Sequence, residues 1–200
     1  MLTSQEVLQI FEKTGAMLKG HFLLTSGRHS DRYFQCARVL QYPRYCEELC
    51  RELAAPFQGR EIGVVAGPAM GGILVAYEAA RALQARNIFA ERENGVMTLR
   101  RGFQLAPGER VLVVEDVVTT GGSVREVIDV VRRAGGLVAG TAALVDRSNG
   151  TVDFGVPFHA LVTVPAVSYA PEECPLCRRG LPAVKPGSRQ PAPAHGTPKA

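Results

Sequence analysis

Residues 111–123 constrain the fold of this 200-residue chain more than any other segment. Residues 111–114 are Val-Leu-Val-Val, a run typical of a strand that is buried on both faces. The run stops at Glu115 and Asp116. We therefore expect two adjacent carboxylates at the carboxyl end of a buried strand.

A helix is predicted directly after this strand. Ser123, with Glu126 three residues later, fits a capping box at a helix start. Valine and isoleucine then recur at the spacing of a buried helix face, at Val124, Val127, Ile128 and Val131. The segment thus predicts a strand, a polar loop and a helix in succession.

The polar loop, Thr119–Ser123, has the composition of a phosphate site. Backbone N–H groups, hydroxyls and the positive end of the helix dipole would all face an anion there. Glu115 and Asp116 would repel a phosphate held against them, so hydrogen bonds from sugar hydroxyls suit them better. Together these groups predict a ribose 5-phosphate site. The alternative is an ordinary strand-to-helix turn with a solvated acidic pair.

A second strand-to-helix turn precedes this one. Residues 62–66 are typical of a buried strand, residues 67–72 are rich in glycine, and an apolar helix is expected from Ile73 to Arg86. Glycine alone is weak support for a ligand site, because tight turns also need it sterically.

Strand and helix patterns alternate along most of the chain. We therefore expect an α/β fold, a doubly wound and mainly parallel sheet. Further helices are predicted over residues 4–14 and 43–55, and further strands over 88–91, 137–145 and 159–164.

Composition favours a soluble protein with a small anionic ligand. The net charge is +4, and no apolar run approaches the roughly 20 residues of a membrane helix. The first residues lack the plan of a signal peptide, so we expect a cytoplasmic protein. Lysine occurs only at positions 13, 19, 185 and 199, so arginine must bind anions in the core. We expect no nucleic-acid or membrane partner.

The five cysteines are expected to be reduced thiols, because Cys36, Cys46 and Cys50 lie in segments that are predicted to be buried. Cys174 and Cys177 have half of a zinc-ligand spacing, but neither a second pair nor a nearby histidine completes it in the sequence. A metal or redox role there stays open, and no metal site made by the protein is predicted.

Three further segments combine polar groups with strand ends. Residues 26–31 form a polar turn between two short predicted strands, either an exposed hairpin or a ligand loop. Residues 92–109 show no strong periodicity and suggest a long loop, with Asn94-Gly95 as a turn. Arg147 follows a predicted strand, where it would bind a ligand or pair with Asp146.

The order Val111–Ser123 resembles the signature of the phosphoribosyltransferases, namely an apolar strand, two acidic residues, two apolar residues and Thr-Thr-Gly. Residues 24–27, Ser30 and Tyr33-Phe34 resemble the amino-terminal hood of the orotate enzymes. The resemblance implies transfer of a 5-phosphoribosyl group from phosphoribosyl pyrophosphate to orotate, giving orotidine 5-monophosphate in pyrimidine (UMP) biosynthesis. It also implies Mg2+ bound through the substrate, and a homodimer.

The resemblance assigns roles to individual residues. Residues that bind phosphoribosyl pyrophosphate would be Met70, Gly71, Glu115, Asp116, Val117, Val118, Thr119, Thr120, Gly121, Gly122 and Ser123. Catalytic groups would be Arg92, Arg101, Glu115 and Asp116. Orotate would contact Tyr33, Phe34, Thr119 and Arg147.

The chain departs from the family at two lysines, since Thr25 and Gly71 stand where the orotate enzymes commonly have lysine. A transferase for another base, such as a purine, and a regulator that binds phosphoribosyl pyrophosphate without catalysis remain alternatives. The hood and Arg147 argue against a purine enzyme. We expect a phosphoribosyltransferase domain over residues 1–170, with the hood at about 1–40, and a proline-rich tail over 171–200 that is extended at least beyond Pro186.

Overall fold

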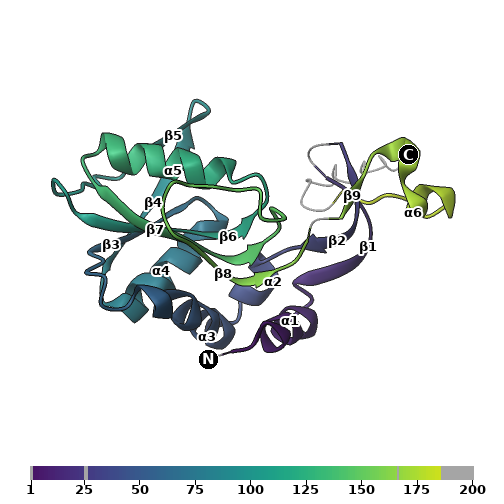
Figure 1. Ribbon diagram of the computed structural model, residues 1–200, viewed down its shortest axis with the longest axis horizontal. Helices are drawn as coiled ribbons and strands as arrows, with labels where there is room; N and C mark the ends of the chain where they lie inside the picture. Colours follow the sequence, from purple (N-terminus) through teal and green to yellow (C-terminus); the bar gives the residue numbers. More distant parts are fainter. Residues whose placement is uncertain (1, 25–26, 166, 186–200) are drawn as a thin grey trace, which may run out of the picture. The chain divides into compact units, whose positions relative to one another are not determined.

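The computed structural model describes residues 2–24, 27–165 and 167–185 (Figure 1). The chain forms two compact units, one of residues 1–18 and 34–166 and the other of residues 19–33 and 167–200. This division differs from the expected boundary at residue 170, because the segment after it joins the unit that contains the β-hairpin of the hood. The part of the tail from Pro186 onward lies outside the described residues.

The larger unit is built on a six-stranded sheet. Its order is β5-β4-β3-β6-β7-β8, and every neighbouring pair is parallel except β4 and β5. The strands are β3 (Val64–Pro68), β4 (Arg86–Glu93), β5 (Val96–Leu99), β6 (Arg110–Val118), β7 (Leu137–Asp146) and β8 (Phe158–Thr163). The predicted mainly parallel α/β sheet is confirmed.

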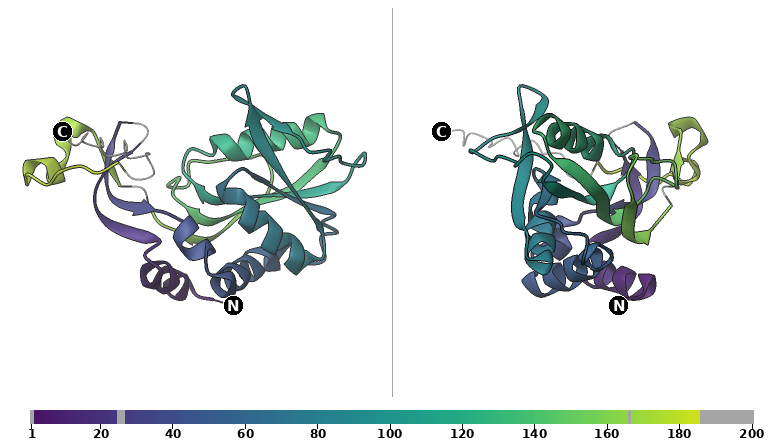
Figure 2. Two further views of the ribbon diagram at one scale, coloured as in Figure 1. Left: turned by 180° about the vertical axis from the view of Figure 1, so that it is seen from behind. Right: turned by 60° about the vertical axis from the view of Figure 1, so that its left-hand side comes forward.

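Helices cover both faces of this sheet. Helix α5 lies on one face, and α3 and α4 lie on the other (Figures 1 and 2). Successive side chains of a strand point to opposite faces of the sheet. Val64 and Ala66 of β3 therefore pack in the core on the α5 side, whereas Val65 packs in the core that contains α3 and α4. The helices are α1 (Ser4–Lys13), α2 (Ala37–Leu40), α3 (Pro43–Ala54), the short 3-10 turn η1 (Ala55–Phe57), α4 (Gly71–Leu83) and α5 (Gly122–Arg133).

The start of α5 differs from the sequence prediction. The helix begins at Gly122, and Gly121 is its N-cap at φ 76°, with no capping hydrogen bond from a side chain. The predicted capping box of Ser123 and Glu126 is therefore wrong, because both residues already lie inside the helix. A carboxylate oxygen of Glu126 instead lies 2.6 Å from a guanidinium nitrogen of Arg92.

Strand β6 is longer than predicted. It continues through the acidic pair to Val118, because Val117 and Val118 pair with Val145 and Asp146 of β7. The two carboxylates thus sit within the last residues of the strand rather than after it.

The segment after β4 is more regular than predicted. Residues 92–99 belong to an antiparallel β-hairpin, so an irregular loop begins only after Leu99. Asn94 and Gly95 form the predicted turn with φ of 51° and 84°. Two positive φ values match the twist of a two-residue hairpin, which explains why the chain folds back at once.

The smaller unit contains a three-stranded sheet and two short helical turns. Strands β1 (Met17–Leu23), β2 (His29–Phe34) and β9 (Ser168–Tyr169) are followed by η2 (Pro171–Glu173) and α6 (Pro175–Arg178). The predicted hairpin is present with shifted strands, and Thr25 and Ser26 of its turn lie outside the described residues. The Val184 carbonyl accepts a hydrogen bond from the Leu23 N–H at 2.8 Å, so the end of the described chain lies beside β1.

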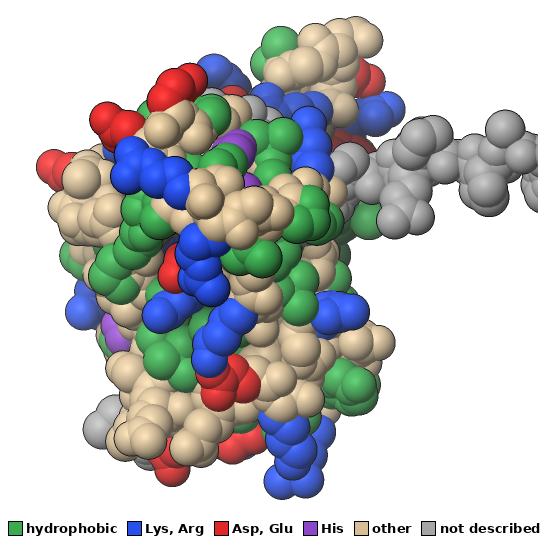
Figure 3. Space-filling model, turned by 90° about the vertical axis from the view of Figure 1, so that its right-hand side faces the viewer, with side chains coloured by type: hydrophobic (Ala, Val, Ile, Leu, Met, Phe, Trp, Pro, Cys, Tyr) green, Lys and Arg blue, Asp and Glu red, His purple; other side chains and the backbone are tan. Residues whose placement is uncertain are grey.

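The surface is mixed in charge on the face that Figure 3 shows. Lys and Arg side chains are spread over that face, with Asp and Glu side chains between them. None of the helices in the described parts of the chain has the length and apolar character required to cross a membrane.

Candidate functional site

A pocket of about 220 Å3 lies at the carboxyl end of β6. Its lining combines the polar loop, the start of α5 and one arginine from β4. The residues are Arg92, Glu115, Val117, Val118, Thr119, Thr120, Gly121, Gly122, Ser123, Val124 and Glu126. The five residues of the predicted phosphate loop, 119 to 123, thus surround one cavity together with the last two residues of β6, Val117 and Val118.

Contacts with Arg125 and Phe154 stabilise the conformation of the loop. The Arg125 guanidinium donates a hydrogen bond to the Thr120 carbonyl at 2.6 Å and lies 5.4 Å from the centre of the Phe154 ring. A Cβ at Gly121 would lie 2.8 Å from that ring, so only glycine fits there, at a positive φ. Sequence reasoning missed Arg125 and Phe154, since nothing in their spacing marks them.

Glu115 is buried, Asp116 is partly buried, and the surroundings of both disfavour the ionised carboxylates. Glu115 is 8% exposed, and burial followed by the charge of Asp116 raises the pKa of Glu115 to about 9. Burial also raises the pKa of Asp116. The Asp116 N–H donates to Glu115 at 3.0 Å, and the Val117 N–H donates to Asp116 at 2.8 Å. The pair therefore favours ligands that bring hydrogen-bond donors or positive charge.

The glycine-rich turn between β3 and α4 lies against Asp116. A Cβ at Gly71 would lie only 2.6 Å from Oδ2 of Asp116. Met70, at 83% exposed, precedes it, and the peptide bond between Ala69 and Met70 is cis. The structure therefore brings the two predicted ligand loops together at Asp116.

Arg147 follows the last residue of β7, as predicted, and is 6% exposed. Its guanidinium carbon lies 5.4 Å from the centre of the Phe34 ring, which also packs edge-on against Phe11. Tyr33 belongs to the smaller unit and packs against Phe22, with 5.8 Å between the ring centres. Of the residues predicted to contact orotate, the structure brings Phe34 and Arg147 together.

The two arginines predicted to be catalytic have different surroundings. Arg92 lines the pocket, where it pairs with Glu126. Arg101 lies outside the pocket lining, with its Nε 3.0 Å from a carboxylate oxygen of Glu91. The sequence did not reveal Glu126 as a pocket residue, because its helical position suggested a cap.

The pair Cys174 and Cys177 has partners that the sequence hid. We expected no histidine to complete this pair, and that expectation is wrong, because His21 and His29 lie beside it. Both histidines are in the β1–β2 hairpin, about 150 positions away along the chain, so no sequence spacing connects them to the cysteines.

Comparison with known proteins agrees with this geometry. Residues 41–154 match the phosphoribosyl transferase domain family. The chain is 70% identical to the orotate phosphoribosyltransferase of Pelotomaculum thermopropionicum and 62% identical to that of Desulforamulus reducens. Each alignment covers 94% of this chain, and 100% and 99% of the respective relative.

A solved structure is also similar to this chain. The crystal structure of orotate phosphoribosyltransferase from Aeropyrum pernix aligns with a TM-score of 0.63 at 29% identity, over 79% of this chain and 93% of that one. On these grounds the chain belongs to the orotate phosphoribosyltransferase family.

Proposed function

We propose that the chain transfers a 5-phosphoribosyl group from phosphoribosyl pyrophosphate to orotate, giving orotidine 5-monophosphate and pyrophosphate. The observation that carries this proposal is the pocket at the end of β6, in which the loop 119–123 lines the cavity together with Glu115. Its size and donors suit a phosphorylated sugar.

The loop would hold the 5-phosphate. Backbone N–H groups of residues 119–122, the hydroxyls of Thr119, Thr120 and Ser123, and the amino end of α5 are suited to an anion. Glu115 and Asp116 would accept hydrogen bonds from the ribose hydroxyls. Burial raises the pKa values of both carboxyl groups, so each hydrogen bond donated by the ribose would stabilise the ionised carboxylate and lower its pKa.

The leaving pyrophosphate would lie at the turn of Met70 and Gly71, because this turn reaches Asp116. An oxocarbenium-like sugar forms as the pyrophosphate leaves. Backbone N–H groups of the turn, with Arg92 and Arg101, would stabilise the negative charge that develops on the pyrophosphate. No covalent nucleophile is needed, so positioning and charge stabilisation would supply the catalysis.

Mg2+ suits this site as a partner of the substrate. Glu115 and Asp116 offer only oxygen, which Mg2+ prefers. Within the described parts of the chain, the single cluster of three or more potential metal ligands lies elsewhere, so pyrophosphate and water would supply the remaining ligands. Bound Mg2+ would neutralise negative charge on the pyrophosphate.

Orotate would be positioned by Arg147, whose planar guanidinium can donate two hydrogen bonds to a carboxylate. The contact with Phe34 supports this role, because the ring fixes the arginine at the strand end. Thr119 and Tyr33 would contribute further contacts to orotate.

A homodimer fits the exposed apolar residues of α4. Leu74 and Tyr77 lie three residues apart on this helix and are 47% and 55% exposed. A second copy of the chain would cover this face. A cytoplasmic location stays a prediction.

Incubation with phosphoribosyl pyrophosphate, Mg2+ and a panel of bases tests the function. We expect turnover with orotate alone among orotate, adenine and hypoxanthine. Turnover of hypoxanthine but not orotate would identify a purine enzyme, and binding without any turnover would identify a regulator. Light scattering of the purified chain tests the dimer, which a monomer at working concentration would contradict.

A further inference from the structure

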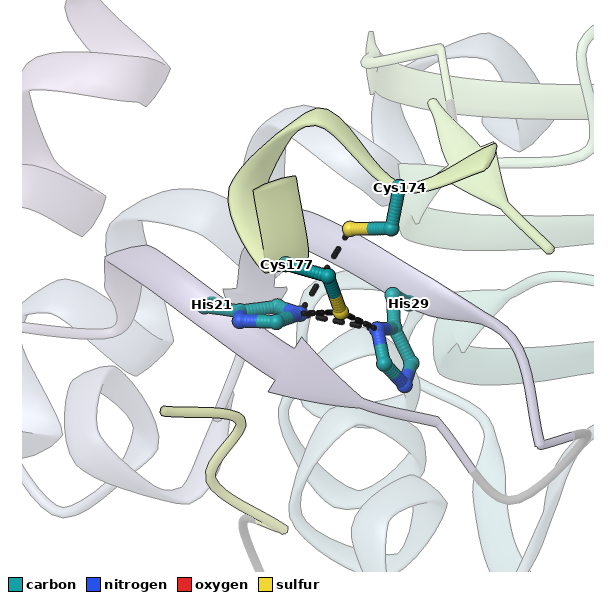
Figure 4. Close-up of side chains that lie close together, drawn as sticks. All are labelled: His21, His29, Cys174 and Cys177. Atoms are coloured by element: carbon teal, nitrogen blue, oxygen red, sulfur yellow. Dashed lines mark hydrogen bonds between the residues drawn. The ribbon is translucent and has the colours of Figure 1, made fainter. Parts of the chain in front are cut away.

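Four side chains in the smaller unit converge on one point (Figure 4). His21 and His29 come from the β1–β2 hairpin, Cys174 precedes α6 and Cys177 lies within it. One ligand atom from each, His21 Nε2, His29 Nδ1 and the two Sγ atoms, lies within 4.8 Å of all the others. His21, His29 and Cys174 are 5%, 8% and 0% exposed, while Cys177 is exposed.

Four of the six distances between these atoms are known, and they are close to the edges of a tetrahedron around a metal ion. The two histidine nitrogens are 2.8 Å apart. The nitrogen–sulfur distances are 3.5 Å and 3.8 Å from His21 to Cys174 and Cys177, and 3.2 Å from His29 to Cys177. Zinc bound at roughly 2.0 Å to nitrogen and 2.3 Å to sulfur requires edges of about 3.3 to 3.8 Å. Small shifts of the imidazoles would therefore admit the ion.

The tautomer of His21 also suits a metal. Its Nδ1 lies 2.7 Å from the Leu181 carbonyl, which can only accept a hydrogen bond, so Nδ1 carries the proton. In the neutral ring Nε2 is then unprotonated, and its lone pair faces the other three ligand atoms. Backbone carbonyls commonly orient metal-binding histidines in this way.

A metal ion would give the smaller unit a source of stability that its packing lacks. The described residues of this unit join neither of the two large hydrophobic clusters of the chain. Small units without a sufficient core are commonly stabilised by a metal or by disulfides. A metal here would join two segments far apart in the sequence, the hairpin at 19–33 and the segment after residue 167.

We propose that His21, His29, Cys174 and Cys177 bind one zinc ion and that this ion stabilises the smaller unit. Two thiolates and two imidazoles in a tetrahedron favour zinc over the oxygen-seeking Mg2+. The protein fills all four positions, so the site is structural and leaves none open for a substrate. The ion fixes the hairpin that carries Tyr33, but its binding does not depend on the proposed reaction.

Elemental analysis of the full chain tests the site directly. The protein is purified without an affinity tag, because tags bind metals, and under reducing conditions. We expect about one zinc per chain. Replacing zinc with Co2+ should give the visible spectrum of a tetrahedral ion with thiolate charge-transfer bands. This measurement requires no variant and therefore remains informative if the variants do not fold.

Matched variants localise the ion. Cys177→Ser and His29→Asn should lose the bound zinc, whereas His159→Asn, which changes a histidine on β8 in the larger unit, should retain it. Chelation should speed amide hydrogen exchange in residues 19–23 and 29–33 while leaving β6 and β7 protected.

Three results would overturn the proposal. The first is only trace zinc after incubation with excess Zn2+ and dialysis. The second is full zinc content in both Cys177→Ser and His29→Asn. The third is a disulfide between Cys174 and Cys177 in protein isolated under reducing conditions, detected as the loss of two hydrogen masses.

Discussion

Gly71 lies so close to Asp116 that a Cβ at position 71 would be 2.6 Å from a carboxylate oxygen. Such a distance is shorter than real Cβ contacts, so any side chain at 71 must displace Asp116. The close approach therefore favours glycine at position 71. It also places the proposed pyrophosphate turn against the proposed ribose pair.

Gly71→Ala should therefore impair catalysis more than stability. The added methyl group would push the Asp116 carboxylate out of position, and a displacement of about 1 Å at a reacting site costs up to about 100-fold in rate. Steady-state kinetics with phosphoribosyl pyrophosphate would show a lower kcat/KM, with Tm little changed.

Ile73→Val is the control for this variant, because it alters the same turn of α4 by removing a methylene group and adds no atoms. It should keep nearly wild-type kinetics. Unchanged kcat/KM in Gly71→Ala would mean that the position of Asp116 is unimportant to the reaction.

Glu115→Gln should become more stable, relative to the wild type, as pH rises. The pKa of Glu115 is raised to about 9, so the folded state binds this proton more tightly than the unfolded chain does. The stabilisation is complete below the unfolded pKa of about 4.3 and is lost as pH rises toward 9. The wild type should lose at most about 1.4 kcal/mol per pH unit in this window. Glutamine does not titrate, so Glu115→Gln should not show this loss.

Urea unfolding of the ligand-free variants at pH 5, 7 and 9 measures this difference. Asp129→Asn, which removes an exposed carboxylate from α5, is the control and should follow the wild type. A constant difference between Glu115→Gln and the wild type across the three pH values would contradict the raised pKa.

The pairing of Arg92 with Glu126 should weaken anion binding at the pocket. Because the carboxylate of Glu126 occupies the arginine, Glu126→Gln should tighten binding of inorganic phosphate by up to about 5-fold, the range of a partly exposed ion pair. Arg92→Ala should weaken it. Calorimetric titration with phosphate measures both, and weaker binding by Glu126→Gln would show that the pair holds the pocket open instead.

The sequence predicted the sheet, most helices and the loop at 119–123, because buried strands, helical spacing and glycine turns are local signals. It also predicted the Asn94-Gly95 turn but not the hairpin around it, since β5 is short and gains its order only by pairing with β4. The start of α5 was misplaced, because Gly121 at φ 76° provides an N-cap that leaves no side-chain signature.

Long-range contacts could not be predicted. Phe154 fixes Gly121, and His21 meets Cys174, only after the chain has folded. No local pattern encodes either pair. The same limit applies to Arg147, whose position at a strand end was foreseen while its packing on Phe34 was not.

Arg147→Ala should impair orotate use far more than binding of phosphoribosyl pyrophosphate. Hydrogen bonds between charged groups contribute about 1.5 to 3 kcal/mol, so kcat/KM for orotate should fall about 10- to 100-fold. Arg147→Lys keeps the positive charge but loses the planar guanidinium that donates two hydrogen bonds. Its kcat/KM for orotate should lie between those of the wild type and Arg147→Ala. Equal losses for both substrates would remove the assigned role.

Initial rates of pyrophosphate release with orotate and with uracil test the central claim most directly, because uracil is orotate without its carboxylate. With phosphoribosyl pyrophosphate and Mg2+, the wild type should use orotate and discriminate strongly against uracil. In Arg147→Ala that preference should largely disappear. Equal rates with the two bases in the wild type, or release with neither, would contradict the account.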